Sequence, residues 1–127
     1  MMTTVVNTSK APAAIGPYSQ AIKQGDLVFT SGQIPFNPAT GALVTSSIED
    51  QTHQALKNVK AVLEAGGASL ETVIKTTVFI KNMDDFARIN AVYATYFPGN
   101  PPARSCVEVA RLPRDVSIEI EAIAYAK

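Results

Sequence analysis

The residues best suited to chemistry lie near the end of the chain, in the run Ala103-Arg104-Ser105-Cys106-Val107-Glu108. Pro101 and Pro102 come just before this run, so the backbone that leads into Arg104 is restricted. A guanidinium held in this way can make two parallel hydrogen bonds to a carboxylate. Arg104 is therefore a candidate for binding the carboxylate of a small substrate.

Alternation along two predicted strands gathers further polar residues around this candidate. Arg104, Cys106 and Glu108 fall on one face of their strand, and Glu119 and Glu121 share a face of the last strand. Together they predict a polar sheet face of Arg, Cys and Glu beside an apolar one. Such a face is commonly a solvated surface. Either glutamate could also form a purely structural ion pair with Arg104, and the sequence alone does not separate these alternatives from a substrate site.

Other kinds of catalytic centre find less support in the sequence. Cys106 is the only cysteine and His53 the only histidine, so a Cys–His nucleophile is the minor alternative to a half-buried structural cysteine. One His and one Cys without ligand spacing do not build a zinc site. Gly66-Gly67 follows a predicted helix rather than a strand, which is the wrong context for a phosphate loop. We therefore expect neither a metal nor a cofactor.

Charge and composition narrow the possible partners and location. Eleven Lys and Arg balance eleven Asp and Glu, whereas nucleic-acid binders usually carry a basic excess. No apolar run approaches the ~20 residues that span a bilayer, and residues 1–10 lack the features of a signal peptide. A single cysteine suits a reducing compartment. We expect a cytoplasmic protein with one domain over residues 1–127 and neither a nucleic-acid nor a membrane partner.

Strands and helices alternate in the segments that must position these residues. In the first half of the chain the pattern predicts a short strand at 3–6, a hairpin over 21–31 with its turn at Gly25-Asp26, and a loop over 33–43. A helix follows, from a Ser46/Glu49 capping box to Gly66-Gly67, and then a strand over 73–80. The second half continues with a helix that is capped by Asn82 or Asp84 and stopped by 98–102, and it ends with strands over 103–109 and 116–125 joined by the turn 112–115. This ββαβαββ order predicts an α+β fold with two helices on one sheet face. With a hydrophobic content of 46%, the other face is expected to be covered by another subunit.

Seven segments of the chain also match a known family in order: 11–21, 30–35, 54–59, 73–79, 90–93, 102–110 and 118–124. Over nearly the whole chain they resemble the Rid family, also called YjgF/YER057c/UK114, and within it the RidA enamine/imine deaminases. The resemblance implies a chorismate-mutase-like fold, with two helices on one face of a mixed sheet. It also implies a homotrimer with three clefts between neighbouring subunits, which would supply the missing cover.

The resemblance also implies an activity and a set of site residues. RidA-like proteins hydrolyse 2-aminoacrylate, 2-aminocrotonate and their imines to a 2-keto acid and ammonia, without a cofactor. Carried onto this sequence, Arg104 would bind the carboxylate of the 2-imino acid and Glu119 would position or activate the attacking water. The pocket would be completed by Tyr18, Ser31, Gly32, Asn90 and the backbone around Cys106.

Two other functions compete with this expectation. The same trimer could be a ligand-binding or chaperone-like regulatory module that uses the cleft as a sensor. An endoribonuclease or translation inhibitor is disfavoured, because the net charge is zero and His53 has no obvious acid–base partner. The loop over 97–102 departs from some bacterial relatives in its length and in Pro101, which leaves the size of the pocket open.

Overall fold

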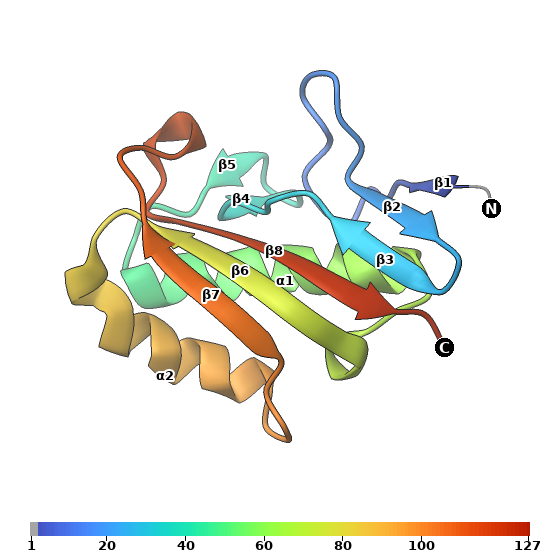
Figure 1. Ribbon diagram of the computed structural model, residues 1–127. Coiled ribbons are helices and arrows are strands. Elements are labelled where there is room, and N and C mark those ends of the chain that lie inside the picture. Colours follow the sequence, from blue (N-terminus) through green and yellow to red (C-terminus); the bar gives the residue numbers. More distant parts are fainter. Residues whose placement is uncertain (1–2) are drawn as a thin grey trace.

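The computed structural model describes residues 3–127, which form a six-stranded sheet with two helices against one of its faces (Figure 1). Across the sheet the strand order is β1-β2-β3-β8-β6-β7, and among these neighbours the β6–β7 pair alone is parallel. The bounds are β1 Thr3–Val6, β2 Ala21–Gln24, β3 Leu27–Thr30, β6 Val73–Ile80, β7 Ala103–Glu108 and β8 Ile118–Tyr125. The predicted α+β class with a mixed sheet is confirmed.

The N-terminal hairpin forms where the sequence predicted it. Strands β2 and β3 pair through Gln24 and Leu27, with Gly25 in the turn at φ 58. Two-residue hairpin turns favour such positive φ values, which glycine adopts without steric cost. The segment predicted as a loop over 33–43 contains a second, two-stranded sheet of β4 Phe36–Asn37 and β5 Ala42–Leu43.

Both predicted helices are present, but the N-cap of each is displaced: it is Ser47 rather than Ser46 for the first, and Asp85 rather than Asn82 or Asp84 for the second. Helix α1 spans Ile48–Ala65, and its N-cap is Ser47, which accepts a hydrogen bond from the Asp50 amide at 3.0 Å. The predicted cap, Ser46, instead donates to the Asp50 carboxylate. Helix α2 spans Phe86–Tyr96. Short 3-10 turns at Leu70–Thr72, Met83–Asp85 and Pro113–Asp115 connect the larger elements, and Asn82 caps the second of them.

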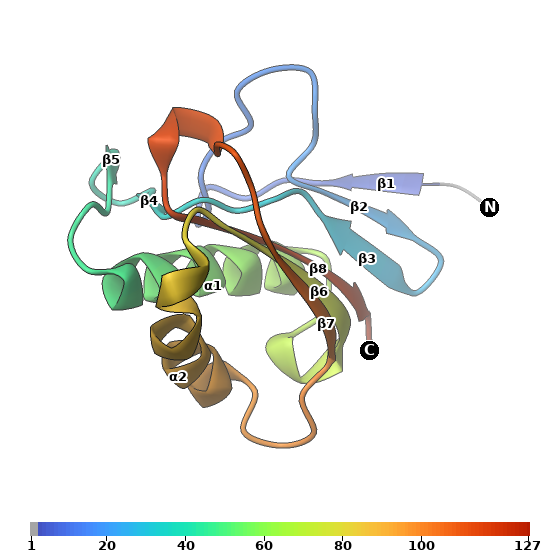
Figure 2. The ribbon, with the colours of Figure 1, turned by 60° about the vertical axis from the view of Figure 1, so that its left-hand side comes forward.

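The core lies between the sheet and the two helices, which Figure 2 shows on the same side of the sheet. Alternate residues of β8 face this core and are fully or almost fully buried: Ile118, Ile120, Ala122 and Ala124. Helix α1 contributes Leu56, Val59, Val62 and Leu63, which are all completely buried. Their spacing is that of an amphipathic helix packed through one face. No helix among residues 3–127 has the length and apolar character needed to cross a membrane.

The opposite face of the sheet carries exposed apolar side chains. Leu27, Phe29, Val107 and Tyr125 are between 37% and 43% exposed, and register places all four on the side away from the helices. Exposed apolar side chains on one sheet face are typical of an interaction surface. The expectation that one sheet face is left uncovered within the chain is therefore confirmed.

The predicted C-terminal hairpin is wrong. Strands β7 and β8 are not neighbours, because β6 lies between them and pairs with both. Strand β7 is parallel to β6, and α2 makes the crossover connection that parallel neighbours require. This leaves β7 at the edge of the sheet, a position that decides where Arg104 can act.

Candidate functional site

Arg104 extends from β7 onto helix α2. Its Nη1 donates to Asn90 Oδ1 at 2.8 Å, and its Cζ lies 4.8 Å from the Tyr93 ring centroid and 5.5 Å from that of Phe86. The guanidinium is thus oriented by one neutral acceptor and two aromatic rings. None of the ion pairs among residues 3–127 involves Arg104. The structural ion pair with Glu119 or Glu121 that the sequence left open does not form within the chain.

Residues of helix α2 and strand β6 support the Arg104 side chain. Asn90 and Tyr93 are three residues apart, so they share a face of α2. The Tyr93 hydroxyl bonds to Thr76 Oγ1 at 2.7 Å, and Thr76 is the register partner of Arg104. Burial raises the pKa of Tyr93, so its phenol stays protonated. Tyr93 was not predicted as a site residue, because its helical spacing is that of an ordinary core residue.

Cys106 follows Arg104 on the same face and is half-buried. Burial raises the pKa of its thiol, and the nearby Arg104 charge only partly offsets this. A thiol is a weak nucleophile unless it is deprotonated. His53 does not supply a base, because its Nδ1 lies 2.8 Å from the Tyr96 hydroxyl between the two helices. The arrangement therefore favours a structural Cys106 over a nucleophilic one.

Glu119 lies on the other side of the sheet, in a cavity that Tyr18, Ser31, Gly32 and Glu121 also line. Burial raises the pKa of the Glu119 carboxyl, and the charge of Glu121 raises it further. A Cβ atom at position 32 would overlap Glu119 Oε2 and lie 2.7 Å from its Cδ. Glycine at this position therefore lets the carboxylate lie directly against the backbone.

A β-bridge brings Gly32 to Glu119. Gln33 and Ile120 exchange both backbone hydrogen bonds, at 2.8 Å and 3.0 Å. This antiparallel pairing brings the segment after β3 beside the beginning of β8, and the Glu119 side chain then lies against Gly32. The motif containing Gly32 is thus joined to a strand almost ninety positions later in the chain, a contact that no local pattern could reveal.

Gln20 positions the loop that carries Tyr18. This side chain is 2% exposed, and it accepts from the Thr8 amide at 2.7 Å and donates to the Pro12 carbonyl at 2.7 Å. Ser31 Oγ donates to the Ser19 carbonyl at 2.6 Å and ties the same loop to β3. Tyr18 itself is half-exposed at the cavity. Gln20 was missed from the sequence, where one amide before an apolar strand gives no signal.

The predicted site residues therefore form two groups. The first, the arginine group, faces the helices and consists of Asn90, Arg104 and Cys106. The second, the glutamate group, lies at the opposite face of the sheet and consists of Tyr18, Ser31, Gly32 and Glu119. Register makes this separation unavoidable, because Val78 pairs with both Cys106 and Ile120 whereas Glu119 pairs with Phe79. The prediction that Glu119 and Glu121 share a polar face with Arg104 and Cys106 is wrong. Alternation was correct within each strand, but register decided which faces coincide.

The family model described as Endoribonuclease L-PSP matches residues 8–126. The chain belongs to this family. The 2-iminobutanoate/2-iminopropanoate deaminase of Escherichia coli K12 is 53% identical over 129 residues, covering 99% of this chain and all of that protein. The structure of the E. coli YjgF gene product superimposes with a TM-score of 0.93 at 50% identity, covering 98% and 99% of the two chains. E. coli TdcF with bound serine gives the same TM-score, identity and coverage. The Rid membership expected from the motifs is confirmed.

Proposed function

We propose that this protein hydrolyses reactive 2-imino acids and their enamines, such as 2-aminoacrylate and 2-aminocrotonate, to 2-keto acids and ammonia. The observation that carries the proposal is the Arg104 guanidinium, which is oriented by Asn90 and the Tyr93 ring and has no carboxylate partner in the described chain. A preorganised cation of this kind suits the carboxylate of a small substrate. Relatives with deaminase names and the bound serine of TdcF support a ligand of amino-acid type.

We further propose that the active cleft forms between two copies of the chain in a homotrimer. One substrate cannot touch both residue groups in one chain, because they lie on opposite faces of the sheet. Strand β7 is an edge strand, so its Arg104 can approach the Glu119 cavity of a neighbour. The exposed apolar residues on the open sheet face, Leu27, Phe29, Val107 and Tyr125, support burial of that face against further copies.

The chemistry follows from these two groups. Arg104 binds the substrate carboxylate, and the carboxylate of Glu119 takes a proton from a water that attacks the electrophilic imine carbon. A tetrahedral carbinolamine results. Glu119 gives this proton to the nitrogen, which completes the neutral carbinolamine, and then takes the proton of the new hydroxyl group. When it passes this second proton to the amine, the C–N bond breaks and ammonia leaves as the carbonyl of the 2-keto acid forms. A raised pKa in Glu119 suits a group that must both accept and donate a proton.

A coupled assay tests the activity. Threonine dehydratase releases 2-aminocrotonate from threonine, and formation of 2-ketobutyrate is followed with and without this protein. We expect Arg104→Ala to lower kcat/KM about 100-fold, since charge-assisted hydrogen bonds contribute about 1.5–3 kcal/mol each. The matched control is Arg88→Ala, which removes an exposed arginine of α2 that pairs with Glu49.

The outcomes separate the alternatives. No acceleration over spontaneous hydrolysis would remove the enzyme proposal, and serine binding without turnover would favour the ligand-binding module. Undiminished activity in Arg104→Ala would leave an enzyme but reject the carboxylate clamp. The cytoplasmic location, the single domain over residues 1–127 and the lack of a nucleic-acid partner remain predictions from composition.

A further inference from the structure

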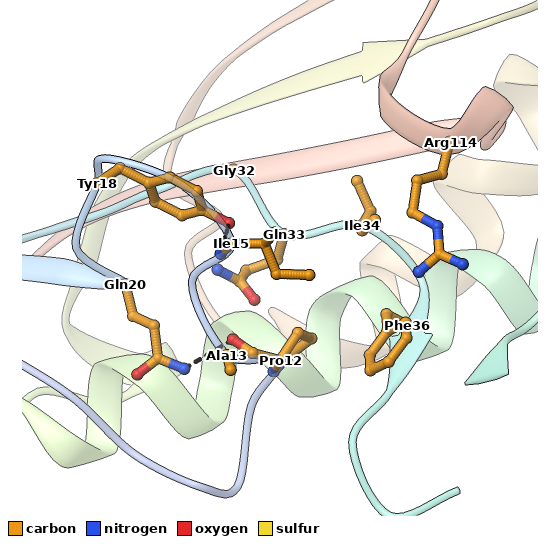
Figure 3. A pocket seen from close by; sticks show the side chains of 10 residues that line it. All are labelled: Pro12, Ala13, Ile15, Tyr18, Gln20, Gly32, Gln33, Ile34, Phe36 and Arg114. Atoms are coloured by element: carbon orange, nitrogen blue, oxygen red, sulfur yellow. Dashed lines mark hydrogen bonds between the residues drawn. The ribbon is translucent and has the colours of Figure 1, made fainter. Parts of the chain in front are cut away.

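A second cavity adjoins the Glu119 cavity behind Tyr18 (Figure 3). Its volume is about 160 Å³. Four residues line both cavities: Ile15, Tyr18, Gly32 and Ile34. The rest of the lining consists of three apolar residues, two amides and one guanidinium, and the proposed reaction does not use it: Pro12, Ala13, Phe36, Gln20, Gln33 and Arg114. An apolar cavity of about 150 Å³ is large enough for a benzene ring, so this one can hold a side chain of several carbons.

Arg114 supplies a cation at one end of this cavity. In Figure 3 its side chain points back from the turn toward Phe36, and its Cζ lies 5.6 Å from the Phe36 ring centroid. Asp115 is already bonded to Arg111, at 2.6 Å. None of the ion pairs within the described part of the chain involves Arg114. The guanidinium is thus exposed, stacked on an aromatic ring and open to an anion.

The backbone at this turn is strained in a way that sets the direction of the side chain. Arg114 and the following Asp115 both have φ at 57, in the left-handed region that residues with a Cβ rarely adopt. Each such residue costs on the order of 1–2 kcal/mol. The residue before them is Pro113, whose ring restricts the backbone. The resulting turn directs the Arg114 side chain over Phe36 of β4.

We infer that this cavity receives the side chain of the imino acid, and that Arg114 binds a carboxylate at the end of that side chain. The inference rests on the proposed function. With the reacting carbon beside Glu119 and Gly32, a chain of methylene groups would pass Tyr18 and lie along Ile34 toward Phe36. The substrate class is therefore the dicarboxylic 2-imino acids, which form when the amine of an acidic amino acid is oxidised. The hydrolysis itself is unchanged.

Selectivity between two imines tests Arg114. The probes are 2-iminobutanoate, released by threonine dehydratase, and 2-iminoglutarate, released from D-glutamate by D-aspartate oxidase. Both are followed by competition with semicarbazide, and the spontaneous rate is subtracted. The quantity of interest is the ratio of kcat/KM for 2-iminoglutarate to that for 2-iminobutanoate. We expect Arg114→Gln to lower this ratio at least about tenfold, because a charge-assisted pair is lost.

Three further variants make the test decisive. Arg114→Lys keeps the charge but loses the planar group that stacks on Phe36, so it should lower the ratio less than Arg114→Gln does. Arg114→Gly removes the guanidinium yet relieves the left-handed strain, so it should remain folded and show the same loss as Arg114→Gln. The matched control Arg88→Gln removes a distant exposed arginine and should leave the ratio unchanged.

Failure of the inference and failure of the proposed function give different results. If 2-iminobutanoate is not accelerated, the deaminase proposal itself is overturned. If 2-iminobutanoate is accelerated but 2-iminoglutarate is not, the assignment of the cavity to a dicarboxylic imine is wrong. A ratio that stays constant in both Arg114→Gln and Arg114→Gly also overturns it.

Discussion

Gly32 determines where the Glu119 carboxylate can lie. A methyl group at this position would overlap the Glu119 carboxyl, which would have to rotate away. We expect Gly32→Ala to fold with a Tm within a few degrees of the parent, because a surface-reaching side chain can move. Its kcat/KM should nevertheless fall at least about tenfold, since a displacement of this size removes the base from its water. Thermal denaturation and the coupled assay measure the two effects, and full activity would show that Glu119 tolerates the displacement.

Glu121 adjusts the proton affinity of its neighbour. Burial is the larger cause of the raised pKa of Glu119, and the charge of Glu121 is the second. Because the ionised form of Glu119 must accept the proton, activity should fall as the pH drops through this raised pKa. Glu121→Gln removes the like charge, so the acidic limb of the kcat/KM profile should move to lower pH. It should not reach the range of a free glutamate, because burial remains. A limb that stays in place or moves upward would contradict this electrostatic role.

At the scale of elements, the loop over residues 8–18 is held chiefly by one buried amide. Gln20 bonds to Thr8 and Pro12, and its loss leaves backbone groups without partners, each costing about 1–3 kcal/mol when buried. We expect Gln20→Leu to loosen the loop more than it lowers global stability. Chymotrypsin cleavage after Tyr18 should become faster, whereas Gln24→Leu, at an exposed position of β2, should cleave at the parent rate. Unchanged cleavage in Gln20→Leu would show that the bond from Ser31 is sufficient.

The sequence predicted some strand pairings of this structure and not others. The β2–β3 hairpin was predictable because its turn is local and Gly25 specifies it. The position of β6 between β7 and β8 was not predictable, because β6 lies far from both strands in the sequence. That single insertion places Arg104 and Glu119 on opposite faces. Motifs could therefore nominate both residues, but neither alternation nor turn chemistry could show that one chain keeps them apart.

The association state is a prediction at the scale of the whole molecule. An uncovered sheet face with Phe29, Val107 and Tyr125 exposed is costly in water, and burying it between copies is favourable. Sedimentation equilibrium should give three times the 13.5 kDa of one chain. Phe29→Glu, which places a charge on this face, should shift the distribution toward single chains and reduce activity with it. A fully active 13.5 kDa species would contradict a cleft shared between subunits.

Complementation between two inactive variants tests the shared cleft directly. Arg104→Ala lacks the carboxylate clamp and Glu119→Gln lacks the base, so each alone should be inactive. In a mixed trimer, a cleft is intact when a Glu119→Gln copy supplies Arg104 and an Arg104→Ala copy supplies Glu119.

Random mixing of equal amounts makes about a quarter of the clefts intact, so refolding the two together should restore about a quarter of the parent activity. Mixing Arg104→Ala with the double variant Arg104→Ala/Glu119→Gln should restore none, since no copy then carries the arginine. Absence of recovery in the first mixture, with mixed trimers verified by a tag on one variant, would mean that the two groups do not meet between chains. Because the two groups lie on opposite faces of every chain, recovery in the mixture is the outcome that the fold predicts.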